Sequence, residues 1–203
     1  MIRKIQTKED REKIQRRNIR IISIILGAIM LFSTAGYFIS DFSQDAQTNK
    51  KVTYNGLEFT QTGYNSWKFT ISGYNFETRF TPEETSNVTL KNSRQIQTYS
   101  EKPLYFSGEP FLDISQTAIQ EISRNLGQFV LRVNMACIED SCANSTTYPL
   151  KTCSDNIIVF KKSLTNYSEI SERQNCTIIM YSELAEDEER TADAFIFRTL
   201  GVK

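Results

Sequence analysis

The four cysteines are the residues whose type and spacing most directly predict chemistry in this chain. They stand at Cys137, Cys142, Cys153 and Cys176. No Cys-x-x-Cys motif occurs and the chain has no histidine, so the pattern matches neither a zinc site nor a thioredoxin-type redox centre. An even number favours disulfides, which form in oxidising compartments. We expect Cys137–Cys142 with Cys153–Cys176 rather than the other two connectivities, because short loops close most easily.

Carboxylates are the second group that could do chemistry, since glycoside hydrolases act through a pair of them. Four stand near the ends of predicted strands or helices, namely Glu109, Asp113, Glu139 and Asp140. Such pairs form in space rather than along the sequence, so an exported carboxylate-dependent enzyme such as a glycan hydrolase stays open as an alternative. Solvated loop acids explain these residues better. The loop between the first two cysteines holds Glu139 and Asp140, which makes it a candidate recognition loop.

Other catalytic signatures are missing from the sequence. Without histidine there is no Ser-His-Asp or Cys-His nucleophile and no histidine-bound metal. The sequence also lacks a phosphate-binding loop, a dinucleotide fingerprint and a Gly-x-Ser-x-Gly motif. We therefore expect a non-catalytic protein with no cofactor and no metal. A thiol–disulfide protein is a third alternative, and it requires at least one reactive thiol.

The uncharged stretch at residues 21–39 predicts a membrane-spanning helix. Nineteen residues at a rise of about 1.5 Å give a helix of about 28 Å, close to the hydrocarbon thickness of about 30 Å. Residues 1–20 carry eight Lys/Arg and three Asp/Glu, a net charge of +5. The positive-inside rule then keeps this tail in the cytoplasm and exports residues 41–203 across the cell membrane. A signal peptide cleaved after Ala35 and a buried soluble helix are the alternatives.

Charge and glycosylation motifs of the exported part agree with this placement. It holds 16 basic and 21 acidic residues, a net charge of −5, which argues against a nucleic-acid ligand. Its partners would be the lipid bilayer, through the anchor, and an unknown protein or other cell-surface partner. Four Asn-x-Ser/Thr sequons are candidate glycosylation sites. They begin at Asn87, Asn144, Asn166 and Asn175.

The elements that must position these residues begin with a polar stalk at residues 40–50. Residues 51–80 predict an antiparallel meander, with a type I′ turn at Asn55 and Gly56 and a second tight turn at Ser72 and Gly73. An apolar face at period two would form its core. That face comprises Phe59, Trp67, Phe69, Ile71, Phe76 and Phe80.

Residues 102–203 predict a mixed α/β core. A capping box at Thr81 and Glu84 predicts a short helix before it. A strand at 102–106, a helix at 114–126 and a strand at 129–137 form a β-α-β unit, which should be a parallel crossover. The apolar runs 156–161 and 177–181 predict central strands, with a weaker strand at 168–172. A last helix over 183–200 would start from Ser182 as N-cap. The exported fold class is therefore α+β, as one domain over residues 51–203.

In general layout the chain resembles uncharacterised single-pass exported membrane proteins of small-genome archaea. The likeness lies in the start RRNIRIISIILGAIMLFSTAGYFIS, the hairpin at residues 54–56, the segment 151–156 and the end at 197–201. No activity is assigned to such proteins, so the resemblance implies a location and not a chemistry. The sequence as a whole predicts a membrane-anchored extracytoplasmic protein that acts by binding or assembly.

Overall fold

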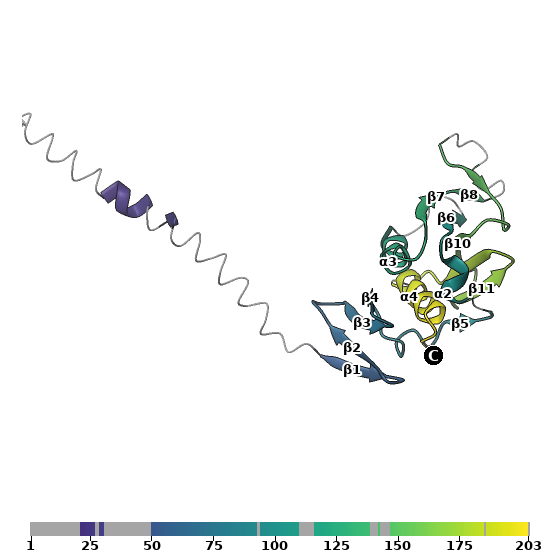
Figure 1. The fold of residues 1–203 in the computed structure, drawn as a ribbon, viewed down its shortest axis with the longest axis horizontal. Helices are drawn as coiled ribbons and strands as arrows, with labels where there is room; N and C mark the ends of the chain where they lie inside the picture. Colours follow the sequence, from purple (N-terminus) through teal and green to yellow (C-terminus); the bar gives the residue numbers. More distant parts are fainter. Residues whose placement is uncertain are drawn as a thin grey trace, which may run out of the picture. The chain divides into compact units, whose positions relative to one another are not determined.

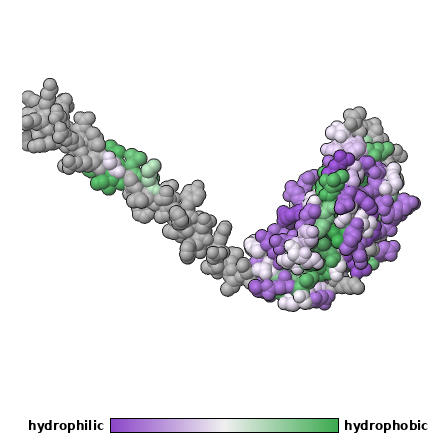
Figure 2. All heavy atoms as spheres, viewed as in Figure 1, coloured by the Kyte–Doolittle hydropathy of each residue, from purple (hydrophilic) through white to green (hydrophobic). Residues whose placement is uncertain are grey.

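The computed structural model describes residues 21–26, 29–30, 50–92, 94–109, 116–138, 142, 147–184 and 186–202. The chain forms two compact units, residues 1–48 and 49–203. In the first unit the described residues are helical, and all of their large apolar side chains are exposed. Figure 2 shows these residues as a hydrophobic segment. None of the helices in the described part of the chain reaches the length and apolar character that a bilayer span requires. The rest of the predicted span, at 27–28 and 31–39, lies outside the described residues.

A four-stranded antiparallel sheet opens the second unit, as the alternation of apolar residues predicts (Figure 1). Its strands, in spatial order, are β1 (Lys51–Tyr54), β2 (Leu57–Gln61), β3 (Trp67–Ile71) and β4 (Tyr74–Thr78). Asn55 and Gly56 both adopt positive φ, 47° and 80°, as a type I′ turn requires. Ser72 and Gly73 do the same at 52° and 83°. Both hairpins were therefore readable from their turn residues.

One face of this sheet is an aromatic core. Phe59, Phe69 and Phe76 are buried, and Phe69 stacks on Phe76 with ring centroids 5.4 Å apart. Phe197 of the C-terminal helix closes the cluster, 6.0 Å from Phe59 and 5.7 Å from Phe69. The other face carries Lys, Glu, Thr and Asn side chains, because successive strand residues point to opposite faces.

A six-stranded mixed sheet forms the rest of the unit. Its spatial order is β5 (Thr89–Leu90), β11 (Glu169–Arg173), β12 (Cys176–Tyr181), β10 (Ile157–Lys162), β6 (Pro103–Glu109) and β7 (Arg132–Met135). The apolar strands β10 and β12 are interior and pair in parallel. β6 and β7 also pair in parallel, and a helix lies between them in the chain. This arrangement confirms the predicted β-α-β unit. β11 pairs antiparallel with β12, which makes the sheet mixed.

Three helices complete the α+β fold: α2 (Ile96–Tyr99), α3 (Gln116–Leu126) and α4 (Asp187–Thr199). α3 and α4 pack on each other and on one face of the mixed sheet (Figure 1). The buried side chains of α4 contact both sheets: Phe195 and Ile196 belong to the mixed-sheet core, whereas Phe197 belongs to the aromatic core. This double contact explains why α4 is buried nearly all round, although its sequence pattern predicted a single apolar face.

Part of the opposite face of the mixed sheet, at Tyr105, Ile157 and Val159, packs against a small disulfide-bonded lobe. It contains the parallel pair β8 (Cys137–Ile138) and β9 (Leu150–Lys151). Disulfides join Cys137 to Cys142 and Cys153 to Cys176, the pairing expected from loop length. Cys176 is the first residue of β12, so the second bridge fastens the turn before β10 to an interior strand.

The start of α4 differs from the sequence-based expectation. Ser182 is not the N-cap; the helix begins at Asp187, after Glu186 in a left-handed conformation. The Ser182 hydroxyl instead donates to the Asp187 carboxylate and accepts the Leu184 N–H. Ser168 also donates to Asp187, at 2.6 Å, and the Arg190 guanidinium does so at 2.7 Å. The residues before α4 are held in this turn, so the helix starts four residues later than predicted.

Two further boundaries were predicted wrongly. Thr81 and Glu84 do form the predicted capping box, with Thr81 N–H to Glu84 Oε2 at 2.7 Å, but the backbone after them makes successive turns rather than a helix. The strand expected at 129–137 starts only at Arg132. The N–H groups of Phe129 and Val130 still bond to the Leu126 carbonyl, so the chain is completing the end of α3 there.

Candidate functional site

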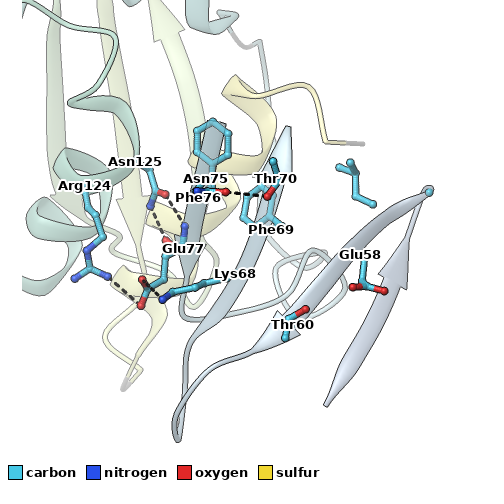
Figure 3. A pocket seen from close by; sticks show the side chains of 12 residues that line it. Glu58, Thr60, Lys68, Phe69, Thr70, Asn75, Phe76, Glu77, Arg124 and Asn125 are labelled. Atoms are coloured by element: carbon cyan, nitrogen blue, oxygen red, sulfur yellow. Dashed lines mark hydrogen bonds and ion pairs between the residues drawn. The ribbon is translucent and has the colours of Figure 1, made fainter. Parts of the chain in front are cut away.

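Side chains from α3 and α4 cover the outer edge of β4. Asn125 of α3 accepts the Glu77 N–H at 2.9 Å and donates to the Glu77 carbonyl at 2.6 Å, as a neighbouring strand would (Figure 3). Asp193 of α4 continues this edge, since one of its oxygens accepts the N–H groups of Arg79 and Phe80 at 2.9 and 2.8 Å. The four-stranded sheet is thus fastened to the helices by hydrogen bonds as well as by aromatic packing.

On the other side of β3 the sheet opens. The β2–β3 ladder contains only the pairs Thr60–Lys68 and Gln61–Trp67, whereas β1–β2 and β3–β4 are paired along their lengths. Beyond Thr60 and Lys68 the two strands diverge towards their turns (Figure 3). This splaying leaves a groove of about 770 Å³, within the range of about 300–1,000 Å³ that is usual for ligand sites.

Four elements line the groove, and most of the lining residues are polar or charged. β2 and its turn, β3, β4 and the C-terminal end of α3 all contribute (Figure 3). The lining residues are Gly56, Leu57, Glu58, Thr60, Lys68, Phe69, Thr70, Asn75, Phe76, Glu77, Arg124 and Asn125. Hydroxyl, amide and charged groups therefore face a shared space, which suits a ligand with many hydrogen-bonding groups of its own.

The groove has more positive than negative charge at its β4 side. Glu77 is approached there by two cations, with Lys68 Nζ 3.9 Å from one oxygen and Arg124 Nη1 3.5 Å from the other. Ser66 also donates to Glu77. The Lys68 and Arg124 side chains are 57% and 56% exposed, so both cations keep donors directed at solvent. On the opposite wall Glu58 is neutralised by Lys51 at 2.8 Å.

A pair of buried carboxyl groups lies behind the groove. Glu121 of α3 and Asp193 of α4 are 6% and 0% exposed, and their carboxyl groups influence each other's titration. Burial first, and then the charge of Glu121, raise the pKa of Asp193 well above its ordinary value, although its two backbone N–H donors offset part of this. Burial likewise raises the pKa of Glu121. The two groups therefore titrate as a coupled pair rather than independently.

A small hollow of about 260 Å³ leads to this pair from the groove side. It shares Glu77 and Arg124 with the groove and has Glu121 in its wall. Asp193 does not line it and is fully buried. A substrate cannot reach Asp193, whereas both carboxyl groups of a glycoside hydrolase flank the bond that is cleaved. The geometry suits a structural clasp between the two helices and β4.

The residues singled out by sequence do not meet at this site. Glu109 ends β6 and forms an ion pair with Lys161 at 2.6 Å. Asp113, Glu139 and Asp140 lie outside the described residues. All four cysteines are described and none has a free thiol. In the described part of the chain, no three side chains of the metal-ligating types come together.

Three of the four sequons are described, and their asparagines are exposed: Asn87, Asn166 and Asn175. The Asn175 side-chain amide donates to the Ser154 carbonyl at 3.0 Å. Asn144 lies outside the described residues. Glycosylation stays a prediction.

Sequence reasoning missed the residues that build the site. Asp193 carried a usable signal, because it is an acid within the apolar run of the last helix, with Ala192 before it and Ala194 after it. Glu121 carried a similar one, since it directly precedes Ile122 in the apolar stripe of α3. The divergence of β2 and β3 left no comparable mark. Comparisons with protein-family models, curated proteins and solved structures found no match.

Proposed function

We propose that this protein is a single-pass membrane protein whose extracytoplasmic domain works by binding or assembly, without catalysis, and that the groove between β2 and β3 holds its ligand. The observation that carries the proposal is the splayed sheet. It exposes hydroxyl, amide and charged groups from four elements in one concave space. Such convergence of polar groups is what orients a ligand in a pre-formed site.

The anchor and the compartment rest on the sequence, with support from two structural observations. The described helical residues of the N-terminal unit expose their apolar side chains, which lipid would cover. The two disulfides of the second unit suit an oxidising compartment. With the basic tail in the cytoplasm, residues 41–203 would stand outside the cell membrane, facing a protein or other cell-surface partner.

The two alternatives have less support. A carboxylate-dependent hydrolase needs two separated carboxyl groups that a substrate can reach. Asp193 is fully buried, and the groove carboxylates Glu58 and Glu77 both form ion pairs with neighbouring cations. A thiol–disulfide protein needs a reactive thiol, whereas all four cysteines are paired and Cys176 is buried.

The test is a parallel screen of the full chain in lipid nanodiscs against a phage library of random peptides and an array of oligosaccharides. Lys68→Glu serves as the counter-screen, because it reverses a charge in the groove. Lys102→Glu is the matched control, an exposed lysine outside the groove. The proposal expects ligands that bind the wild-type chain and Lys102→Glu but lose at least about tenfold in affinity on Lys68→Glu. Ligands that bind Lys68→Glu as well as the wild type, or no ligand in either screen, would contradict it.

A further inference from the structure

We infer that the occupant of the groove is an extended peptide segment that pairs with the open edge of β3 or β2 and places a carboxylate against Lys68 and Arg124. This inference rests on the proposed function and names the ligand class for the same site. Two independent features carry it: the backbone register of the splayed strands and the charge imbalance around Glu77.

The register of the antiparallel ladder shows which backbone groups face the groove. The Thr62 N–H donates to the Ser66 carbonyl at 2.7 Å, so Thr62 and Ser66 occupy a hydrogen-bonded position of the β2–β3 hairpin. Hydrogen-bonded pairs recur every second residue, so Thr60 and Lys68 are the next such pair. The following one would be Glu58 with Thr70. The ladder does not include it.

The backbones of Glu58 and Thr70 therefore point into the groove without a ladder partner. On β2, the Gln61 N–H donates to the Lys50 carbonyl. The N–H and C=O groups of the odd-numbered residues of β2 therefore point towards β1, and those of Glu58 point away from β1. On β3 the alternation is the same: Ile71 pairs with Tyr74 across a two-residue turn and faces β4, which directs Thr70 towards β2. An unpaired strand edge is a template for an added strand.

An extended polypeptide is the ligand that matches this edge. Its N–H and C=O groups recur at the period of the strand, and peptide recognition by added strands uses those groups for affinity. The side chains of the added strand alternate between the two faces of the sheet, and those on the polar face lie beside Lys68 and Glu77. A carbohydrate would use the hydroxyl and amide side chains but has no backbone to continue the ladder.

The charge pattern selects an acidic side chain. Lys68 and Arg124 share one carboxylate, Glu77, at 3.9 and 3.5 Å, and a second carboxylate would give each cation its own partner. Arg binds carboxylates through bidentate hydrogen bonds that Lys cannot form. Arg124 should therefore orient the ligand carboxylate as well as supply positive charge. The opposite wall offers no such excess, since Lys51 neutralises Glu58.

The experiment measures binding to the full chain in nanodiscs by fluorescence polarisation. The probe is a labelled hexapeptide of alternating Thr and Val with one central Glu. Matched probes replace the Glu by Gln or Lys, or carry N-methyl groups on the amides of one edge. A tetramer of N-acetylglucosamine tests the carbohydrate alternative.

The groove variants of the protein are Lys68→Glu, Arg124→Glu and Thr70→Pro. The proline of Thr70→Pro removes an N–H from the open edge of β3. Controls are Lys102→Glu and Thr53→Pro, the latter on the outer edge of β1 and outside the groove.

We expect the Glu peptide to bind, with affinity about tenfold or more lower for the Gln and Lys peptides, for the N-methylated peptide and for each groove variant. The controls should bind as the wild type does. Melting temperatures identify any variant that fails to fold, and the modified peptides test the inference on the unmodified chain. Groove-dependent binding of the sugar without the peptide would overturn the strand-pairing inference and leave the proposed function standing. Failure of both probes would overturn the inference, and the open-ended screen then decides the proposed function separately.

Discussion

Asp193 holds β4 through a carboxyl group that titrates outside its usual range. Its two backbone donors favour the ionised form, whereas burial and Glu121 favour the protonated one, and the second pair of effects is stronger. Both raised pKa values mean that the folded chain binds protons more tightly than the unfolded chain. The pair therefore stabilises the fold fully at pH values below the ordinary carboxyl pKa. This stabilisation decreases as the pH rises through that pKa and above it.

Replacing Asp193 by Asn should remove this loss of stability at higher pH. The amide oxygen can still accept from Arg79 and Phe80, while its N–H₂ group can donate to Glu121. We expect the unfolding free energy of Asp193→Asn to vary less between pH 4 and pH 8 than that of the wild type. Urea unfolding of the full chain in nanodiscs, followed by the single tryptophan Trp67, measures it.

Asp193→Ala is the comparison that separates the proton from the hydrogen bonds. It leaves the N–H groups of Arg79 and Phe80 without their acceptor, which should cost about 1–3 kcal/mol per group at every pH. Equal pH slopes for the wild type and Asp193→Asn would show that the pair does not titrate as described.

Asp187 should respond to pH in the opposite direction. Burial raises its pKa, but the hydrogen bonds from Ser168, Ser182 and Arg190 together outweigh burial and lower it. The folded pKa thus lies below the unfolded value, so this stabilisation is present above the ordinary pKa of Asp and is lost as the pH falls through the folded value. Asp187→Asn should cost about 1.5–3 kcal/mol at neutral pH and less in acid, by the same unfolding measurement. A cost that does not change with pH would contradict this.

Among the elements, those that follow from local rules were predictable. Asn55 and Gly56 set one hairpin, and the apolar runs set β10 and β12 as interior strands, because these features depend on neighbouring residues alone. The start of α4 was not predictable in this way. Ser182 has the residue type of an N-cap, but it bonds instead to Asp187 and to Ser168, and the tertiary fold brings Ser168 beside it.

Asn125 tests the edge of β4 as an element. Replacing it by Ala leaves the Glu77 N–H and carbonyl without their partner in α3. We expect a loss of about 1–3 kcal/mol in the unfolding free energy. Gln120→Ala, at an exposed position of the same helix, should change stability by less than about 0.5 kcal/mol. If both variants have the unfolding free energy of the wild type, the Asn125 amide does not stabilise the edge of the sheet.

At the scale of the whole molecule, the sequence was sufficient for the α+β class, the meander and the β-α-β unit, but not for the site. The groove exists because β2 and β3 separate after Thr60 and Lys68, and neither residue differs in type from its counterparts elsewhere in the sheet. The carboxyl pair joins Glu121 and Asp193 from two helices that meet only in the folded chain. Both features depend on contacts between distant segments, which a single sequence does not reveal.

The proposed membrane anchor and the two disulfides can both be tested by measuring the mass of the protein. Protein extracted from its native membrane and alkylated should have the full-length mass without label, apart from any glycans, and should gain four alkyl groups only after reduction. A mass that starts near Gly36 would show a cleaved signal peptide instead of an anchor. Labelling without reduction would contradict the two disulfides.

Hydrogen–deuterium exchange of the full chain in nanodiscs, with and without the Glu hexapeptide, tests most directly whether the groove is the ligand-binding site of the second unit. We expect slower exchange confined to residues 57–60 and 68–71, and no such change in Lys68→Glu. Unchanged exchange in these two segments, or protection located elsewhere in the domain, would contradict it.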